Sequence, residues 1–213
     1  MNAGFSNLAT LKAHLLPASL RSGTDFDTAL QAIGKGVAVA FENYCNRRFQ
    51  RQAAAEQIFS ADYAHFSLER YPVESISAIA LKTSETEGFV AQTINDFVQT
   101  IKNSTGMVYL LDDAGPFYAQ VKFTYTGGYW WRVAEPTDQD YSSDTLPTGA
   151  TALPDDLKLA WLNQCEVIWK SRDNLGTTLI DDAAQSKPVT LADLKLSPDV
   201  QRILDDYRRV QLV

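Results

Sequence analysis

Histidine and cysteine are scarce in this chain, whose 213 residues include two of each. His14 and His65 lie outside any HExxH or HxH arrangement. The chain therefore has almost no suitably placed histidines for a zinc site or a histidine-based catalytic triad. Cys45 and Cys165 are far apart, without CxxC spacing, inside largely apolar helical patterns. We expect both cysteines to be small core residues.

Long runs of one charge sign and long apolar runs are missing too. The chain has 19 Lys and Arg against 26 Asp and Glu, a net charge of −7, and no five-residue run of Lys or Arg. This balance disfavours tight nonspecific binding to a phosphate backbone. Neither 18 consecutive apolar residues nor a leader pattern with a cleavage site occurs. We therefore expect a cytosolic product that is neither secreted nor associated with a membrane.

Motifs for nucleotide or carboxylate chemistry are weak. Gly34 and Gly36 lie inside a helical pattern, and Gly127 and Gly128 lack the Lys and Ser/Thr that follow in a phosphate loop. The carboxylate pairs could suggest a metal or acid–base site. Their expected positions explain them more simply. Asp112/Asp113 lie in a turn, Asp155/Asp156 at a helix start, Asp181/Asp182 in a linker and Asp205/Asp206 on a solvated helix face. We predict no catalytic residue, no metal and no cofactor, which leaves a small hydrolase as the weakest alternative.

Arg47, Arg48 and Arg51 form a local basic cluster. A predicted helix over 24–49 places the first two in its last turn, where cations complement the helix dipole. A solvated helix end is the simpler interpretation, and a phosphate site or an interface anchor stays open.

Apolar residues make up 45% of the chain, enough for a substantial core. Their spacing of three and four residues predicts helices over 6–16, 24–49, 153–176 and 197–213. A period of two predicts strands over 56–60, 64–68, 76–82, 107–111 and 119–126. The expected fold class is α+β, mainly α: a helical body with an inserted small antiparallel β-sheet and a C-terminal docking helix.

These elements predict two parts. Residues 1–176 form the helical body, with the β insertion at about 55–131 and a loop at 132–152. Residues 177–213 form a flexible linker and the C-terminal docking helix. In the helix over 153–176, Leu159, Leu162 and Trp169 lie outside the main apolar face. We therefore expect this helix to pack against neighbours on two sides.

The stretch 121-VKFTYTGGYWW-131 ends a predicted strand in two glycines and three aromatics. Tyr129, Trp130 and Trp131 either brace the sheet within the subunit or anchor a protein contact, and both interpretations stay open.

The order of four segments resembles the head–tail connector (adaptor, or head-completion) proteins of tailed bacteriophages. These segments are 8-LATLKAHLL-16, the helix ending 43-NYCNRRF-49, the β stretch ending 123-FTYTGGY-129, and 153-LPDDLKLAWLNQCEVIWKSRDNLG-176. The resemblance spans most of the chain. The chain departs from shorter family members in its 134–152 loop and its extended β region.

The resemblance implies a non-enzymatic homo-oligomeric ring, dodecameric as is common in the family, attached to the portal protein. Such a ring extends the channel for genomic DNA, which passes without specific binding, and provides a platform for a tail, stopper or tail-completion protein. It implies assembly in the host cytoplasm and a final place in the virion neck. A tail-terminator or stopper protein of the neck is the alternative.

The same resemblance implies that Gly127 and Gly128 end the strand and let the chain turn. It also suggests which residues make the contacts. We expect Leu159, Leu162 and Trp169 to make the lateral contacts between subunits. We expect the terminal helix to dock against the portal or a neighbouring subunit. Its docking residues are Ile203, Leu204, Tyr207, Arg208 and Arg209.

Overall fold

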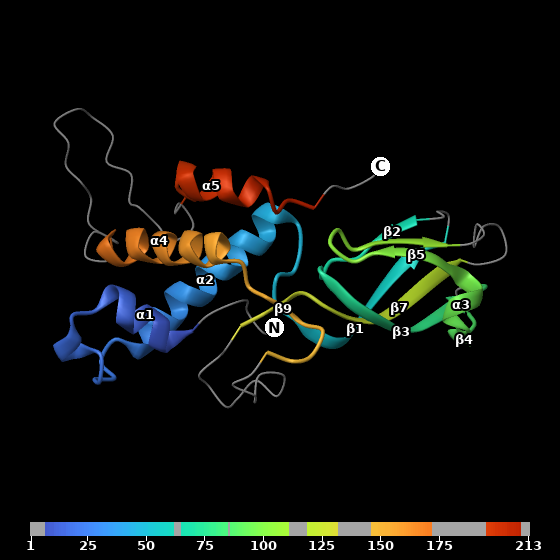
Figure 1. Cartoon of the computed structure of the whole chain (residues 1–213), viewed down its shortest axis with the longest axis horizontal. Coiled ribbons are helices and arrows are strands. Elements are labelled where there is room, and N and C mark those ends of the chain that lie inside the picture. Colours follow the sequence, from blue (N-terminus) through green and yellow to red (C-terminus); the bar gives the residue numbers. More distant parts are fainter. Residues whose placement is uncertain are drawn as a thin grey trace. The chain divides into compact units, whose positions relative to one another are not determined.

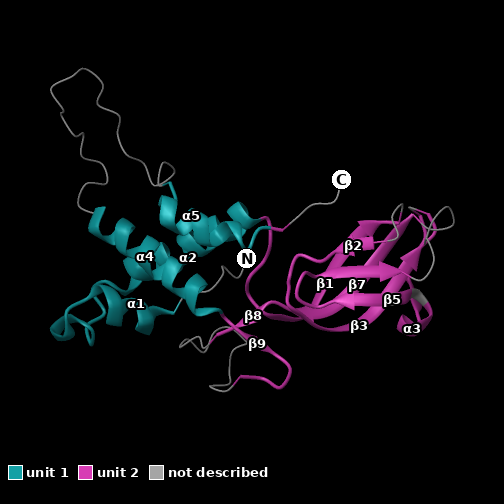
Figure 2. Ribbon diagram, turned by 45° about the horizontal axis from the view of Figure 1, so that its top comes forward, with its two compact units in different colours: residues 1–45, 133–135, 154–208 teal, residues 46–132, 136–153, 209–213 magenta. Residues whose placement is uncertain are grey.

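The computed structural model describes residues 7–61, 65–84, 86–110, 119–131, 146–171 and 195–209. The chain divides into two compact units (Figures 1 and 2). The helical unit comprises residues 1–45, 133–135 and 154–208, and the sheet unit comprises residues 46–132, 136–153 and 209–213. The predicted linker at 177–190 and the predicted division after residue 176 lie outside the described residues.

The helical unit contains α1 (Leu8–Leu15), the short η1 (Ala18–Leu20), α2 (Asp27–Cys45), α4 (Asp155–Ser171) and α5 (Pro198–Asp205). Helix α4 contacts α1, α2 and α5 (Figure 1). Their inward faces form a core in which both cysteines are enclosed, as predicted, and burial raises the pKa of the Cys165 thiol. The largest side chains of this core are Leu11, Leu30, Phe41, Leu157, Trp161 and Leu204.

Two buried polar side chains hold the helices in register. The indole of Trp161 donates to the carbonyl of Gly34 in α2 at 3.0 Å. Gln164, only 1% exposed, accepts from the backbone N–H of Ser197 at 2.9 Å and donates to the carbonyl of Lys195. Because a buried amide is costly unless its groups are paired, Gln164 fixes the start of α5 against α4.

Helix α5 is therefore an integral part of the helical unit. Val200 and Leu204 are buried in its core. At its end, Tyr207 donates to the Asp156 carboxylate at 2.7 Å and Tyr44 donates to Asp205 at 2.8 Å. This last bond raises the pKa of Tyr44, because it stabilises the neutral phenol beside a carboxylate.

The sheet unit contains two antiparallel sheets and a parallel pair of short strands. The four-stranded sheet has the order β1-β7-β3-β4: β1 (Gln52–Ser60), β7 (Gln120–Gly127), β3 (Val73–Lys82) and β4 (Val90–Gln92). The three-stranded sheet has the order β2-β6-β5: β2 (His65–Ser67), β6 (Met107–Leu110) and β5 (Val98–Lys102), with α3 (Ile94–Phe97) before β5. Strands β8 (Tyr129–Trp130) and β9 (Thr151–Ala152) pair in parallel.

One core joins the two antiparallel sheets. Strand β7 lies between β1 and β3, and its alternation buries Val121, Phe123 and Tyr125. Phe66 and Val108 of the three-stranded sheet belong to the same apolar cluster. The period of two in the sequence thus marks the face of each strand that turns inward.

The predicted fold class, mainly α, is wrong. Of the described residues, about 38% are helical and about 32% lie in strands, so neither class dominates. The five predicted strands correspond to β1, β2, β3, β6 and β7, but β4, β5, β8 and β9 are added to them. Strands of two to five residues carry too little alternation to be distinguished from loops.

The helices are also shorter than the periodicity suggested. Helix α2 ends at Cys45, because Asn46 adopts φ +50°, a left-handed conformation that ends helices. Arg47 and Arg48 are therefore not in its last turn. Helix α5 ends at Asp205, and residues 206–209 are not helical.

Leu204→Ala tests whether α5 is part of the helical core. Leu204 is 0% exposed, so the free energy of unfolding should fall by about 2–5 kcal/mol. The matched control is Leu159→Ala on α4, whose side chain is 53% exposed and whose loss should change that free energy by less than about 0.5 kcal/mol. Denaturant unfolding of both variants checks the difference, and equal effects would contradict the packing of α5.

Candidate functional site

The most highly organised polar region of the sheet unit surrounds three arginines, Arg47, Arg51 and Arg70, which we call the arginine cluster. Three segments supply it and its partners: residues 46–51, 70–74 and 127–130. They are separated in sequence but joined by backbone hydrogen bonds, from Arg48 N–H to the Glu69 carbonyl and from Gly128 N–H to the Pro72 carbonyl, both at 2.9 Å.

Arg47 is buried, with 4% of its surface exposed. Its guanidinium carbon lies 3.3 Å from the centre of the Tyr71 ring, 4.8 Å from that of Phe49 and 5.4 Å from that of Tyr129. It also donates to the carbonyl of Tyr71. A desolvated cation over aromatic faces stabilises a fold by about 2 kcal/mol, so Arg47 is a core residue and not a solvated helix end.

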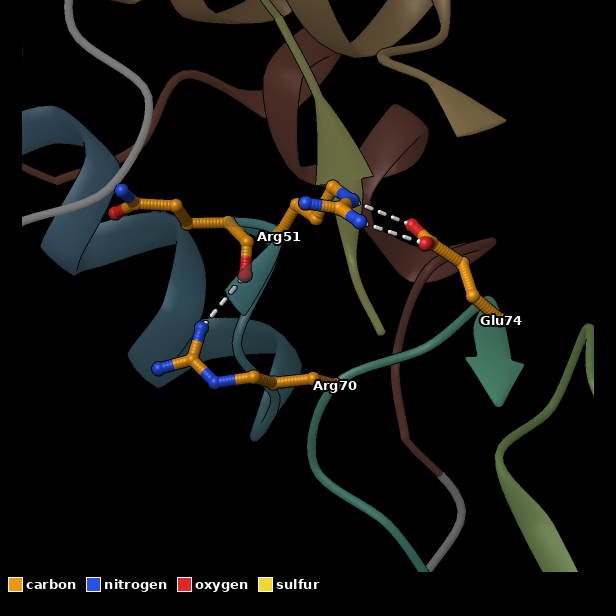
Figure 3. Close-up of polar contacts among 4 residues, drawn as sticks. Arg51, Arg70 and Glu74 are labelled. Atoms are coloured by element: carbon orange, nitrogen blue, oxygen red, sulfur yellow. Dashed lines mark hydrogen bonds and ion pairs between the residues drawn. The ribbon is translucent and has the colours of Figure 1, made fainter. Parts of the chain in front are cut away.

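Arg51 and Glu74 form a bidentate pair (Figure 3). Arg51 donates through Nε and Nη2 to the two carboxylate oxygens of Glu74 at 2.7 and 2.8 Å. The side chains are 15% and 10% exposed. Nearby, Arg70 donates to the Gln50 carbonyl at 2.6 Å. These arginines bind groups of their own unit, so the geometry favours a structural role over a phosphate site.

Gly127 and Gly128 lie where these segments approach most closely. A Cβ on Gly127 would lie 2.5 Å from the Arg70 carbonyl oxygen. Gly128 has φ +100°, and a Cβ there would lie 2.6 Å from the Gln50 carbonyl oxygen. Only glycine fits such a backbone approach without displacing a neighbour.

The three aromatics that follow differ in their surroundings. Tyr129 is buried, its N–H donates to the Phe49 carbonyl at 2.7 Å, and its ring stacks on Phe49 with the centroids 6.5 Å apart. Trp130 is half-buried in β8, and its carbonyl accepts from the N–H of Leu153 at 2.8 Å. Trp131 is half-buried as well. A protein contact through these two indoles stays a prediction.

The predicted lateral residues lie on different sides of α4. Leu159 is exposed and Leu162 is half-buried. Trp169 is buried and meets Phe26 edge-to-face, with ring centroids 5.5 Å apart. Among the three, Leu159 offers the largest apolar surface to another molecule.

The predicted docking residues are also distributed between the core and the surface. Leu204 is enclosed in the helical unit, whereas Ile203 and Tyr207 are half-buried and Arg208 is exposed. Arg209 belongs to the sheet unit and donates to the Ser67 hydroxyl at 2.9 Å. The structure therefore does not bring the five side chains to one surface, and their docking role stays a prediction.

Other titratable groups among the described residues form ion pairs and hydrogen-bonded pairs. No group of three His, Cys, Asp or Glu residues that could hold a metal ion occurs among the described residues. His14 lies 3.3 Å from Glu166, whose pKa is lowered chiefly by the hydrogen bond from Lys170. Asp112, Asp113, Asp181 and Asp182 lie outside the described residues. Within the described part of the chain, no helix combines the length and apolarity needed to cross a bilayer.

Sequence reasoning missed Arg70, Glu74 and Gln164. Each acts through a partner at least 20 positions away along the chain. Periodicity and short motifs carry no signal for such pairs, because strand pairing in the sheet unit and helix packing in the helical unit bring them together.

Gly128→Ala should destabilise the sheet unit by at least about 2 kcal/mol, because both the positive φ and the Gln50 carbonyl oppose a side chain. The matched control is Gly88→Ala, since a Cβ at Gly88 meets no atom within 4 Å. Thermal or denaturant unfolding checks the pair, and a neutral Gly128→Ala would refute the close approach.

A double-mutant cycle with Arg51→Ala and Glu74→Ala should give a coupling energy above about 1 kcal/mol, because the pair is bidentate and largely shielded from solvent. The control cycle uses Lys122 and Glu56, an ion pair at 3.1 Å whose Glu56 side chain is 58% exposed. Its coupling should stay below about 1 kcal/mol. Equal couplings would show that the Arg51–Glu74 pair is no more than a surface contact.

Comparison with known proteins relates the fold to phage-like particles. No family model matches the chain, and no curated protein matches it. Two solved structures are similar over 97% of this chain and 90% of theirs. One is the neck of an empty gene transfer agent (GTA) particle computed with C6 symmetry, at 17% identity and a TM-score of 0.55. The other is the virion of a native GTA particle, at 16% identity and a TM-score of 0.53. At these identities the likeness is one of fold, and it extends over 97% of this chain.

Proposed function

We propose that the chain is a structural, non-enzymatic subunit of the neck of a tailed phage or phage-like particle. It forms a homo-oligomeric ring, dodecameric by the family resemblance, which attaches to the portal, extends the DNA channel and provides the platform for a tail, stopper or tail-completion protein. The observation that carries the proposal is the fold shared with chains of a neck and a virion over 97% of this chain.

Symmetry and charge support the ring. One of the similar structures is a neck computed with C6 symmetry, and repeated copies around an axis require two complementary surfaces on each subunit. The net charge of −7 suits a channel through which DNA slides without being held. In this proposal the ring assembles in the host cytoplasm and stays at the head–tail junction of the virion.

The role of α5 follows from its anchoring. Val200 and Leu204 attach it to the helical unit, which leaves Ile203 half-exposed and the Arg208 side chain 61% exposed. In this proposal the outer side of α5 contacts the portal or a neighbouring subunit. Leu204 contributes by holding the helix in place.

Deleting the gene for this chain from the genome that encodes the particle should leave heads and tails unjoined in electron micrographs. The double variant Ile203→Asp, Arg208→Glu should reduce the yield of joined particles while the purified chain still unfolds cooperatively, because neither side chain is enclosed in the core. Leu20→Asp provides the control for introducing an acid at an exposed apolar position, since Leu20 is 43% exposed. Complete particles formed without the chain would contradict the proposal.

A further inference from the structure

The outward face of α2 is almost free of charge. Its exposed positions are occupied by Thr28, Ala29, Ala32, Lys35, Gly36, Val39 and Asn43. The exposed face of a surface helix normally carries several charged residues. Here Lys35 is the one charge at the exposed positions of α2, and no carboxylate accompanies it.

This face borders an open apolar groove of about 120 Å³ within the helical unit. Its lining is mainly apolar and comes from α2, α4 and the segment before α5: Ala32, Ile33, Gly36, Ala40, Ile168 and Leu196. Ala32, Gly36 and Ala40 follow one another at intervals of four residues, which aligns them in one row along the helix.

No close contact within the described part of the chain requires a glycine at position 36. A Cβ at this position would meet no atom within 4 Å, and glycine inside a helix costs about 1 kcal/mol relative to alanine. Gly34, two residues earlier, is buried and accepts the Trp161 hydrogen bond. Gly36 instead keeps the groove open toward the outside, where a second backbone can approach closely.

The complementary shape is on the same chain. Leu159, Asn163 and Val167 form an exposed row on α4, again at intervals of four residues, and its two apolar ends are 53% and 46% exposed. Rows at this spacing on two helices pack as ridge into groove. At about 100° per residue, Leu159 lies about 180° around α4 from Ile168 of the groove, Asn163 about 140° and Val167 about 100°. The row therefore faces away from the groove.

We infer that the α2 groove receives the Leu159–Val167 row of a second copy of this chain. Because the row and the groove face different directions from α4, the contact is head-to-tail and can repeat around an axis. Copies with a net charge of −7 repel one another, and the α2 side of the contact, whose exposed positions carry Lys35 and no carboxylate, avoids adding to that repulsion. This inference rests on the proposed ring and identifies its lateral contact.

The first test is a cross-link between the middle of the groove and the middle of the row. The full-length double variant Gly36→Cys, Asn163→Cys is assembled with the portal ring under reducing conditions and then oxidised. A ladder of disulfide-linked multimers on a non-reducing gel is expected, and only monomer is expected from each single variant. The native thiols of Cys45 and Cys165 are buried and common to all samples. Dimers from a single variant would instead indicate a two-fold contact and overturn the inference.

The second test fills the groove. Gly36→Leu should weaken self-association at least about tenfold in sedimentation experiments, while leaving the fold intact because the site is open. Gly88→Leu, at another glycine where an added Cβ meets no atom within 4 Å, should associate like the wild type. Normal association of Gly36→Leu, or assembled rings that give no ladder, would overturn this inference and leave the neck proposal standing. A wild-type chain that never joins a portal ring or particle would instead overturn the neck proposal.

Discussion

The sheet unit depends on the close approach of three backbone segments at Gly127 and Gly128. A side chain at either glycine would collide with the carbonyl of Arg70 or Gln50. The approach brings Tyr71, Phe49 and Tyr129 around the buried guanidinium of Arg47, and it places Arg51 against Glu74. The end of the central strand, the aromatic residues and the arginines are therefore parts of one arrangement, since none of these contacts forms unless the backbones meet.

In the helical unit, Gln164 and Trp161 hold separate segments of the chain together. Their buried hydrogen bonds fix α5 and α2 against α4, so that the helices keep one register. The outer surfaces are then defined by what the core does not use: the open groove beside α2 and the exposed row on α4. A ring subunit needs this combination of a rigid interior and two unlike faces, because every copy must present the same geometry to its neighbours.

Much of this could be predicted from the sequence where the signal is local. Periods of 3.6 and 2 located the four main helices and five strands. Asn46 ended α2 earlier than its apolar pattern suggested, and this moved Arg47 from a helix end into an aromatic core. The short strands and the Arg51–Glu74 pair depend on strand pairing across the chain, for which one sequence carries no signal. The groove could not be predicted for a similar reason, because its lining comes from two helices and the segment before α5.

Electron microscopy with mass measurement, on the purified chain alone and mixed with a candidate portal ring, tests the central claim most directly. The account predicts a closed ring coaxial with the portal, with a central opening wide enough for duplex DNA and a mass equal to a whole number of subunits. A chain that stays monomeric and does not bind the portal would contradict it.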